Sequence, residues 1–73
     1  MRTLLRNVST GCYFEGPGKW TNDPQAAYDF RMIDRALQFA QVWRLGDVEI
    51  AFAFESEVKT VPPEKIEVGY SQH

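Results

Sequence analysis

Cysteine and histidine are nearly absent from the sequence. Cys12 is its one cysteine, and His73, the last residue, is its one histidine. A single cysteine excludes a disulfide within the chain, and without a cysteine framework a reducing compartment is the simpler interpretation. Zinc sites take three or four ligands from Cys, His and acidic side chains. The sequence therefore predicts no metal site, and nothing in it indicates a cofactor.

Catalytic motifs are lacking as well. A nucleophilic Cys12 would need a base within hydrogen-bond reach, and His73 lies at the chain end. The stretch GPGK, 16–19, does not have the GxxxxGK[ST] spacing of a phosphate loop, and Pro17 lacks the N–H group that a phosphate would use. We therefore predict no catalytic residue and a protein that is not an enzyme. The alternative is an enzyme whose site, around Glu15 and Cys12, is completed by a partner or a second copy.

Long apolar runs are missing too. No stretch approaches the ~20 apolar residues that a transmembrane helix needs, and the start, MRTLLRNVST, falls short of the apolar core of a signal peptide. We expect no membrane contact and a cytoplasmic protein. The 73 residues predict a single domain, 1–73, with a thin core, because so short a chain buries only about 60 % of the surface that its unfolded form exposes.

Charge is spread unevenly along the chain. Residues 1–46 hold six bases and four acids (net +2), whereas residues 47–73 hold two bases and six acids (net −4). An ordinary solvated surface explains this pattern. The alternative is a bipolar molecule whose halves attract within the fold or between copies. The net charge of −2 argues against nucleic acid as a partner, because such binders normally carry a basic excess.

The segment DVEIAFAFE, 47–55, carries the clearest strand pattern. Large apolar residues alternate with small or acidic ones. One face would carry Val48, Ile50, Phe52 and Phe54. The alanines on the other face leave room for a further segment to lie against it.

The segment MIDRALQFAQVWRL, 32–45, predicts the main helix. Its apolar stripe comprises Ile33, Ala36, Leu37, Ala40 and Trp43, with Phe39 on the flank. Asp34 in the first turn and Arg44 in the last match the helix dipole. Gly46 stands where a left-handed cap is expected.

Shorter elements surround these two. Residues 3–8 and 12–15 predict strands, and Asp23 before Pro24 predicts a single helical turn. Pro62 and Pro63 end regular structure. The alternating residues 66–70 then pair either with 48–54 or with another copy. The predicted fold class is α+β, with one main helix (about 32–45) packed on a small antiparallel sheet of three to five strands.

The run TGCYFEGPGKWTNDPQAAYDF, followed by a helix that begins IDRA, resembles a loose group of small uncharacterised bacterial proteins. The matching positions, within about 10–50, are Tyr13, Phe14, Gly16, Trp20, Thr21, Asp23, Ala27, Phe30 and Ala36. The resemblance implies a compact single-helix α+β unit. It implies no activity, because none is assigned to the group.

The aromatic loop CYFEGPGKWTND, 12–23, is the candidate partner-binding surface, carried by Tyr13, Glu15, Lys19 and Trp20. Trp20 either fills the end of the core or is partly exposed as an anchor for a partner. The predicted function is a small non-enzymatic interaction module that acts as a homodimer or as an accessory to a larger protein. A binder of single-stranded nucleic acid is the alternative. It would use Tyr13, Lys19, Trp20, Arg2 and Arg6.

Overall fold

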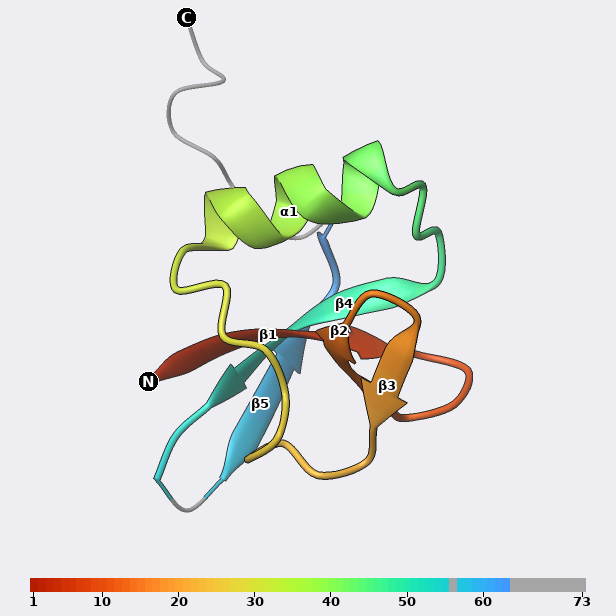
Figure 1. Cartoon of the computed structure of the whole chain (residues 1–73). Coiled ribbons are helices and arrows are strands. Elements are labelled where there is room, and N and C mark those ends of the chain that lie inside the picture. Colours follow the sequence, from red (N-terminus) through yellow and green to blue (C-terminus); the bar gives the residue numbers. More distant parts are fainter. Residues whose placement is uncertain (56, 64–73) are drawn as a thin grey trace, which may run out of the picture.

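One α-helix lies across an antiparallel β-sheet (Figure 1). The computed structural model describes residues 1–55 and 57–63. Their elements are β1 (Arg2–Asn7), β2 (Tyr13–Gly16), β3 (Lys19–Thr21), α1 (Ile33–Val42), β4 (Val48–Ala53) and β5 (Val58–Val61). The sheet has five strands in the order β3-β2-β1-β4-β5 within this part of the chain. The predicted α+β class, with one helix on three to five strands, is confirmed.

The β1–β4 pair forms the centre of the sheet. Its register runs from Arg2 opposite Ala53 to Asn7 opposite Val48. Because side chains alternate along a strand, Val48 and Ile50 face α1 and Ala51 faces away; all three are buried. The strand predicted at 47–55 is therefore confirmed over Val48–Ala53. Phe54 was expected on the buried face, but it follows the strand's end and is 44 % exposed.

Small residues let α1 approach the sheet closely. Ala36 and Ala40 are buried. They join a core cluster with Leu5, Phe14, Phe30, Val48 and Ile50. The expected place of Trp43 in this buried stripe is wrong, because α1 ends at Val42 and the indole is 61 % exposed. It stacks instead on Phe39, with ring centroids 5.6 Å apart and an interplanar angle of 27°.

The helix ends in a Schellman-type cap. Leu45 N–H donates to the Ala40 carbonyl (2.8 Å), and Arg44 N–H donates to the Gln41 carbonyl (3.2 Å). The left-handed residue of this motif is Arg44, with φ of 54°. The expectation that Gly46 supplies it is wrong. Arg44 also lies beyond the last helical turn, which contains no basic residue.

The segment between β3 and α1 passes from one face of the sheet to the other (Figure 1). Asp23 begins it with the single capped turn that the sequence predicts: its side chain accepts the Gln25 N–H (2.9 Å). The Asp23 and Pro24 carbonyls accept the N–H groups of Ala26 (3.0 Å) and Ala27 (3.3 Å). Ala27 is then buried beneath the sheet in a second cluster. That cluster comprises Leu4, Tyr13, Ala27, Ala51 and Ala53. Phe30, three residues later, is buried on the helix side. The room left by the alanines of β4 is thus filled by this segment.

Two strands were not predicted. β3 has three residues, and β5 has four. β5 pairs with β4 from Ile50–Val61 to Ala53–Val58. It occupies the edge of β4 that was one of the two positions expected for residues 66–70, which lie outside the described residues. In the part of the chain that the structure describes, no helix has the length and apolar character needed to cross a membrane.

Candidate binding cavity between the helix and the β2–β3 hairpin

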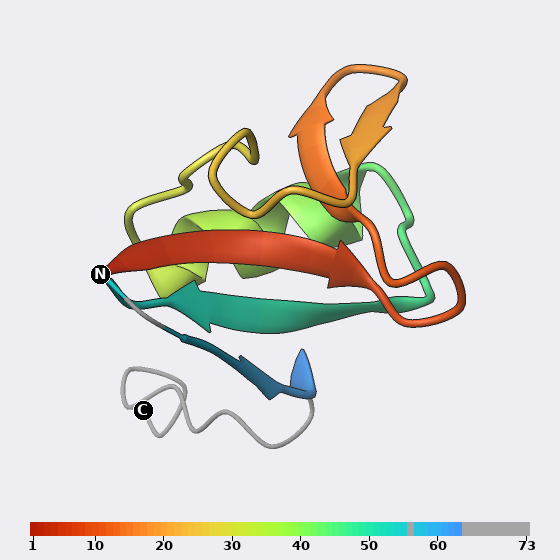
Figure 2. The same ribbon diagram turned by 90° about the horizontal axis from the view of Figure 1, so that it is seen from below.

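The β2–β3 hairpin stands away from the long β1–β4 pair (Figure 2). Pro17 and Gly18 form its two-residue turn, and Gly18 has a φ of 68°. Proline followed by a residue of positive φ is the signature of a type II turn. The register shifts between Phe14 and Gly16, so Glu15 is an extra residue that bends the strand. The bulge follows Phe14, whose ring packs against Phe39 of α1.

Phe14 stands at the centre of a group of aromatic rings. Its centroid lies 4.8 Å from Phe39, 5.6 Å from Trp20, 5.8 Å from Phe30 and 6.4 Å from Tyr28. The Trp20 ring meets Phe14 edge to face, at 80°. Such arrangements stabilise by about 0.5–1.5 kcal/mol per pair beyond area burial. The rings come from β2, β3, the crossing segment and α1, so they tie the hairpin to the helix.

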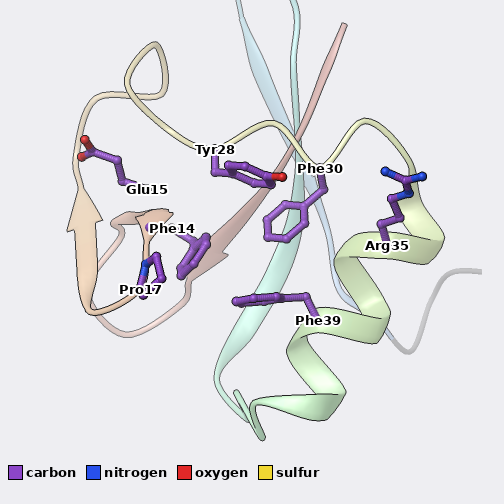
Figure 3. A pocket seen from close by; sticks show the side chains of 8 residues that line it. Phe14, Glu15, Pro17, Tyr28, Phe30, Arg35 and Phe39 are labelled. Carbon is purple, nitrogen blue, oxygen red and sulfur yellow. The ribbon is translucent and has the colours of Figure 1, made fainter.

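These rings surround a cavity of about 420 Å³. Figure 3 shows Phe14, Tyr28, Phe30 and Phe39 pointing toward one another around it. Its lining comprises Phe14, Glu15, Gly16, Pro17, Tyr28, Phe30, Arg35 and Phe39. A smaller cavity of about 100 Å³ adjoins it, shares Phe14, Pro17 and Phe39, and reaches Trp20 and Trp43. The apolar lining is therefore continuous from Tyr28 to Trp43.

The rim aromatics are open to solvent. Tyr28 is 53 % exposed and Trp43 is 61 % exposed, whereas Phe14 and Phe30 at the base are 7 % and 5 % exposed. A well-packed aromatic base with an exposed aromatic rim is typical of surfaces that receive a partner's apolar group.

Two charged side chains line the cavity in different states. Glu15 is half-buried and forms an ion pair with Lys19, with 3.2 Å between Glu15 Oε2 and Lys19 Nζ. Arg35 is exposed and makes no ion pair with any residue in 1–55 and 57–63. Its guanidinium extends toward the start of α1, at the end of the cavity beyond Phe30 (Figure 3). Within the described part of the chain, Glu15 is therefore neutralised by Lys19, and Arg35 has no ion-pair partner.

Asp29 fixes the segment that carries Tyr28 and Phe30. Its Oδ1 accepts the backbone N–H groups of Thr3 (2.9 Å) and Arg31 (2.8 Å). Burial raises the pKa of Asp29, but those two hydrogen bonds and the charges of Arg2 and Arg31 outweigh it and hold the pKa below its ordinary value. Phe30 N–H also donates to the Thr3 carbonyl at 2.7 Å. Asp29 and Phe30 are thus held by β1, and Tyr28 is held by β2 through its N–H bond to the Phe14 carbonyl (2.9 Å).

The four residues predicted as a partner-binding surface do not form one surface. Tyr13 lies on the opposite face of the sheet, 9 % exposed, in the second cluster. Glu15 and Lys19 are joined in the ion pair. Trp20 is half-buried, with its ring against Phe14 on the helix side. Glu15 and Trp20 line the two adjoining cavities.

The residues proposed to bind nucleic acid are mostly engaged within the fold. The Arg2 guanidinium donates to the carbonyls of Pro24 and Ala27. Arg6 pairs with Glu49 at 2.7 Å. With Tyr13 on the opposite face, the structure does not bring these side chains together beside Trp20.

Cys12 is half-buried, with its Sγ 4.0 Å from the Thr10 carbonyl. It lies outside the cavity lining, which includes Glu15. Within residues 1–55 and 57–63, no group of three or more His, Cys, Asp or Glu side chains is placed to hold a metal ion. His73 lies outside the described residues.

Sequence reasoning missed Tyr28, Arg35 and Phe39 as site residues. A signal was present on the helix: Arg35, Phe39 and Trp43 recur every four residues, which places them on one face. No such signal marks Tyr28, because the crossing segment has no regular period. A comparison of the chain with protein-family models, curated proteins and solved structures finds no match. The resemblance to small bacterial proteins therefore stays an expectation.

Proposed function

We propose that this chain is a small non-enzymatic interaction module that holds an apolar group of a partner in the aromatic cavity. The observation that carries the proposal is the 420 Å³ cavity between α1 and the hairpin, with rings at its base and at its rim. Binding sites of this kind measure about 300–1,000 Å³ and carry few polar groups. Glu15 and Arg35 are the two charged side chains of this lining.

The composition of the cavity supports binding and not catalysis. Nucleophilic chemistry needs a nucleophile with a base within hydrogen-bond reach, and general acid–base chemistry needs a free titratable group beside the reacting proton. The Glu15 carboxylate is bound to the Lys19 ammonium, and the remaining lining apart from Arg35 consists of rings, Gly16 and Pro17. The alternative of an enzyme completed by a second copy has no further support in this lining.

A neutral aromatic probe tests the proposal. We expect a naphthalene carboxamide to shift the backbone amide resonances of Phe14, Tyr28 and Phe39 in a titration followed by ¹H–¹⁵N NMR. Tyr28→Ala removes an exposed rim ring and should weaken binding at least several-fold, since a buried aromatic contact contributes on the order of 1 kcal/mol. The matched control is Val42→Ala, an exposed helix residue outside the lining. Shifts that are scattered over the whole surface would contradict the proposal.

Light scattering across the micromolar range decides the kind of partner. If the parent has the mass of two chains and Trp43→Ser lowers it to the mass of one, the exposed Trp43 ring belongs to an interface with a second copy. A mass of one chain in low and in high salt would exclude the homodimer and leave a different molecule as the partner.

A further inference from the structure

We infer that the aromatic cavity selects ligands that join an aromatic body to a carboxylate, with Arg35 as the counter-ion. The inference rests on the proposed function, because it names the ligand chemistry of the same cavity. Three observations carry it: the ring lining, the ion pair of Glu15 with Lys19, and the lack of an ion pair for Arg35 among residues 1–55 and 57–63.

The lining specifies an aromatic body. Four rings, Phe14, Tyr28, Phe30 and Phe39, face the space. Their mutual angles range from 33° to 79°, so they present both faces and edges to a guest. Aromatic guests gain from edge-to-face and offset contacts beyond the area that they bury. A flat ring system therefore fits this cavity better than a branched aliphatic group of similar volume.

The charges at the rim specify the sign of the ligand. Glu15 already has Lys19 at 3.2 Å, so a cationic ligand would have to displace that ammonium. Arg35 stands one helical turn before Phe39 on the same face of α1, and no acidic side chain in the described part of the chain pairs with it. Arg31, just before α1, is offset by Asp29, whose pKa its charge helps to lower, and Asp34 of the first turn lies outside the lining. Among the residues that the structure describes, Arg35 is therefore the one positive side chain of the cavity lining.

Aromatic rings also attract cations, which makes a quaternary ammonium the competing ligand class. Aromatic cages for such cations exclude positive side chains, because the ring quadrupole is weak compared with a full like charge at close range. Arg35 lines this cavity, so a bound cation would lie near a guanidinium. The guanidinium instead offers a planar pair of donors to a carboxylate.

Three probes with one naphthalene body test the inference: the carboxylate, the neutral carboxamide and naphthylmethylammonium. By NMR titration at neutral pH and low salt, we expect the carboxylate to bind about two- to five-fold more tightly than the carboxamide, the range typical of an exposed ion pair. The ammonium should bind most weakly, and high salt should reduce the difference. Arg35→Gln should abolish the preference for the carboxylate. Arg44→Gln, an exposed arginine outside the lining, should preserve it.

A carboxylate of this kind can belong to a small molecule or to the end of a protein chain. A short peptide that ends in Phe with a free carboxylate, compared with the same peptide amidated, separates the two sources. Tighter binding of the free-ended peptide than of the naphthalene carboxylate would assign the site to a protein C-terminus. Tighter binding of the naphthalene carboxylate would assign it to a small aromatic acid.

The outcomes separate this inference from the proposed function. If the carboxamide shifts the cavity resonances but the carboxylate binds no better, or if Arg35→Gln leaves the preference intact, the selection by charge is wrong and the binding module stands. If none of the three probes shifts the cavity resonances, both are wrong. Because Arg35 is exposed, the amide spectrum of Arg35→Gln should otherwise match the parent and confirm its folding.

Discussion

Two arginines adopt a backbone conformation that arginine disfavours. Arg31 and Arg44 have φ of 71° and 54°, and a residue with a Cβ in this region costs about 1–2 kcal/mol. Each stands at an end of α1: Met32, which follows Arg31, donates its N–H to the Phe30 carbonyl at 2.8 Å, and Arg44 closes the C-terminal cap. These two turns lie at the two ends of α1, the helix that carries Arg35 and Phe39 of the cavity lining. Backbone strain is therefore concentrated beside the candidate site.

Arg44→Gly should therefore stabilise the protein. The exposed Arg44 side chain makes no ion pair in the described part of the chain, and glycine adopts positive φ without the Cβ penalty. After the larger entropy of glycine in the unfolded state is subtracted, we expect a gain of about 1 kcal/mol in the free energy of unfolding, measured by urea denaturation. Arg44→Ala, which keeps the Cβ, is the control and should change stability little. Equal gains from both variants would contradict the strain at this position.

Asp29 should make stability depend on pH on the acid side. Its folded pKa is lowered, so its contribution is present above the unfolded pKa of about 4 and is lost as pH falls through the folded pKa. Asp29→Asn should lower the free energy of unfolding at pH 7 by about 1 kcal/mol, because a neutral amide oxygen accepts weaker hydrogen bonds than a carboxylate.

Urea denaturation of both proteins from neutral to strongly acidic pH measures this dependence. The two curves should converge below the folded pKa, where the aspartate is also neutral. A constant difference at all pH values would show that Asp29 acts through its shape and not through its charge.

At the scale of elements, the β2–β3 hairpin is the part that creates the cavity. Its turn depends on Gly18, whose φ is 68° and whose Cβ position is open. Gly18→Ala should thus cost about 1 kcal/mol through backbone strain alone, measured by urea denaturation. Gly46→Ala is the matched control, because Gly46 has equal space and no positive φ, and should stay within about 0.5 kcal/mol of the parent. A similar loss from both substitutions would rule out strain at Gly18 as the cause.

Most elements that the sequence predicts are long enough to show a period; β2, predicted at 12–15, is the exception, with only four residues. The ten residues of α1 and the six of β4 repeat their patterns, whereas β3 and β5 are too short for alternation to stand out from chance. Trp43 was misplaced because the 3.6-residue period continues through it in sequence, while the helix ends at Val42. A repeating pattern shows which residues share one face of a helix, but it does not show at which residue the helix ends.

At the scale of the whole molecule, one continuous segment contributes to the clusters on both faces of the sheet. Ala27 fills the lower face and Phe30 joins the helix-side cluster, so the crossing between them couples the two clusters. The cavity combines residues from β2, this crossing and α1. The sequence predicts that Phe14 and Trp20 lie in one aromatic loop, but it does not predict that Tyr28 and Arg35 lie beside them. Their meeting depends on the path of a segment that has no repeating pattern.

Arg2 holds that crossing in place, and its removal should destabilise the whole fold. The guanidinium donates to the Pro24 and Ala27 carbonyls from the start of β1 and also lowers the pKa of Asp29. Arg2→Met keeps the apolar stem but leaves both carbonyls without this donor, so we expect a loss of about 2 kcal/mol in the free energy of unfolding. Arg2→Lys should lose roughly half as much, since an ammonium cannot reproduce the two-pronged geometry.

Urea denaturation at neutral pH measures both variants, with Arg35→Met as the control. Arg35 is exposed and makes no ion pair in the described residues, so its substitution should change stability by no more than about 0.5 kcal/mol. The Tyr28 and Phe30 amides should exchange faster with solvent in Arg2→Met, because their N–H groups bond to Phe14 and Thr3 only while the crossing is held. Unchanged exchange at these two amides, together with lost stability, would show that Arg2 acts on β1 and not on the crossing.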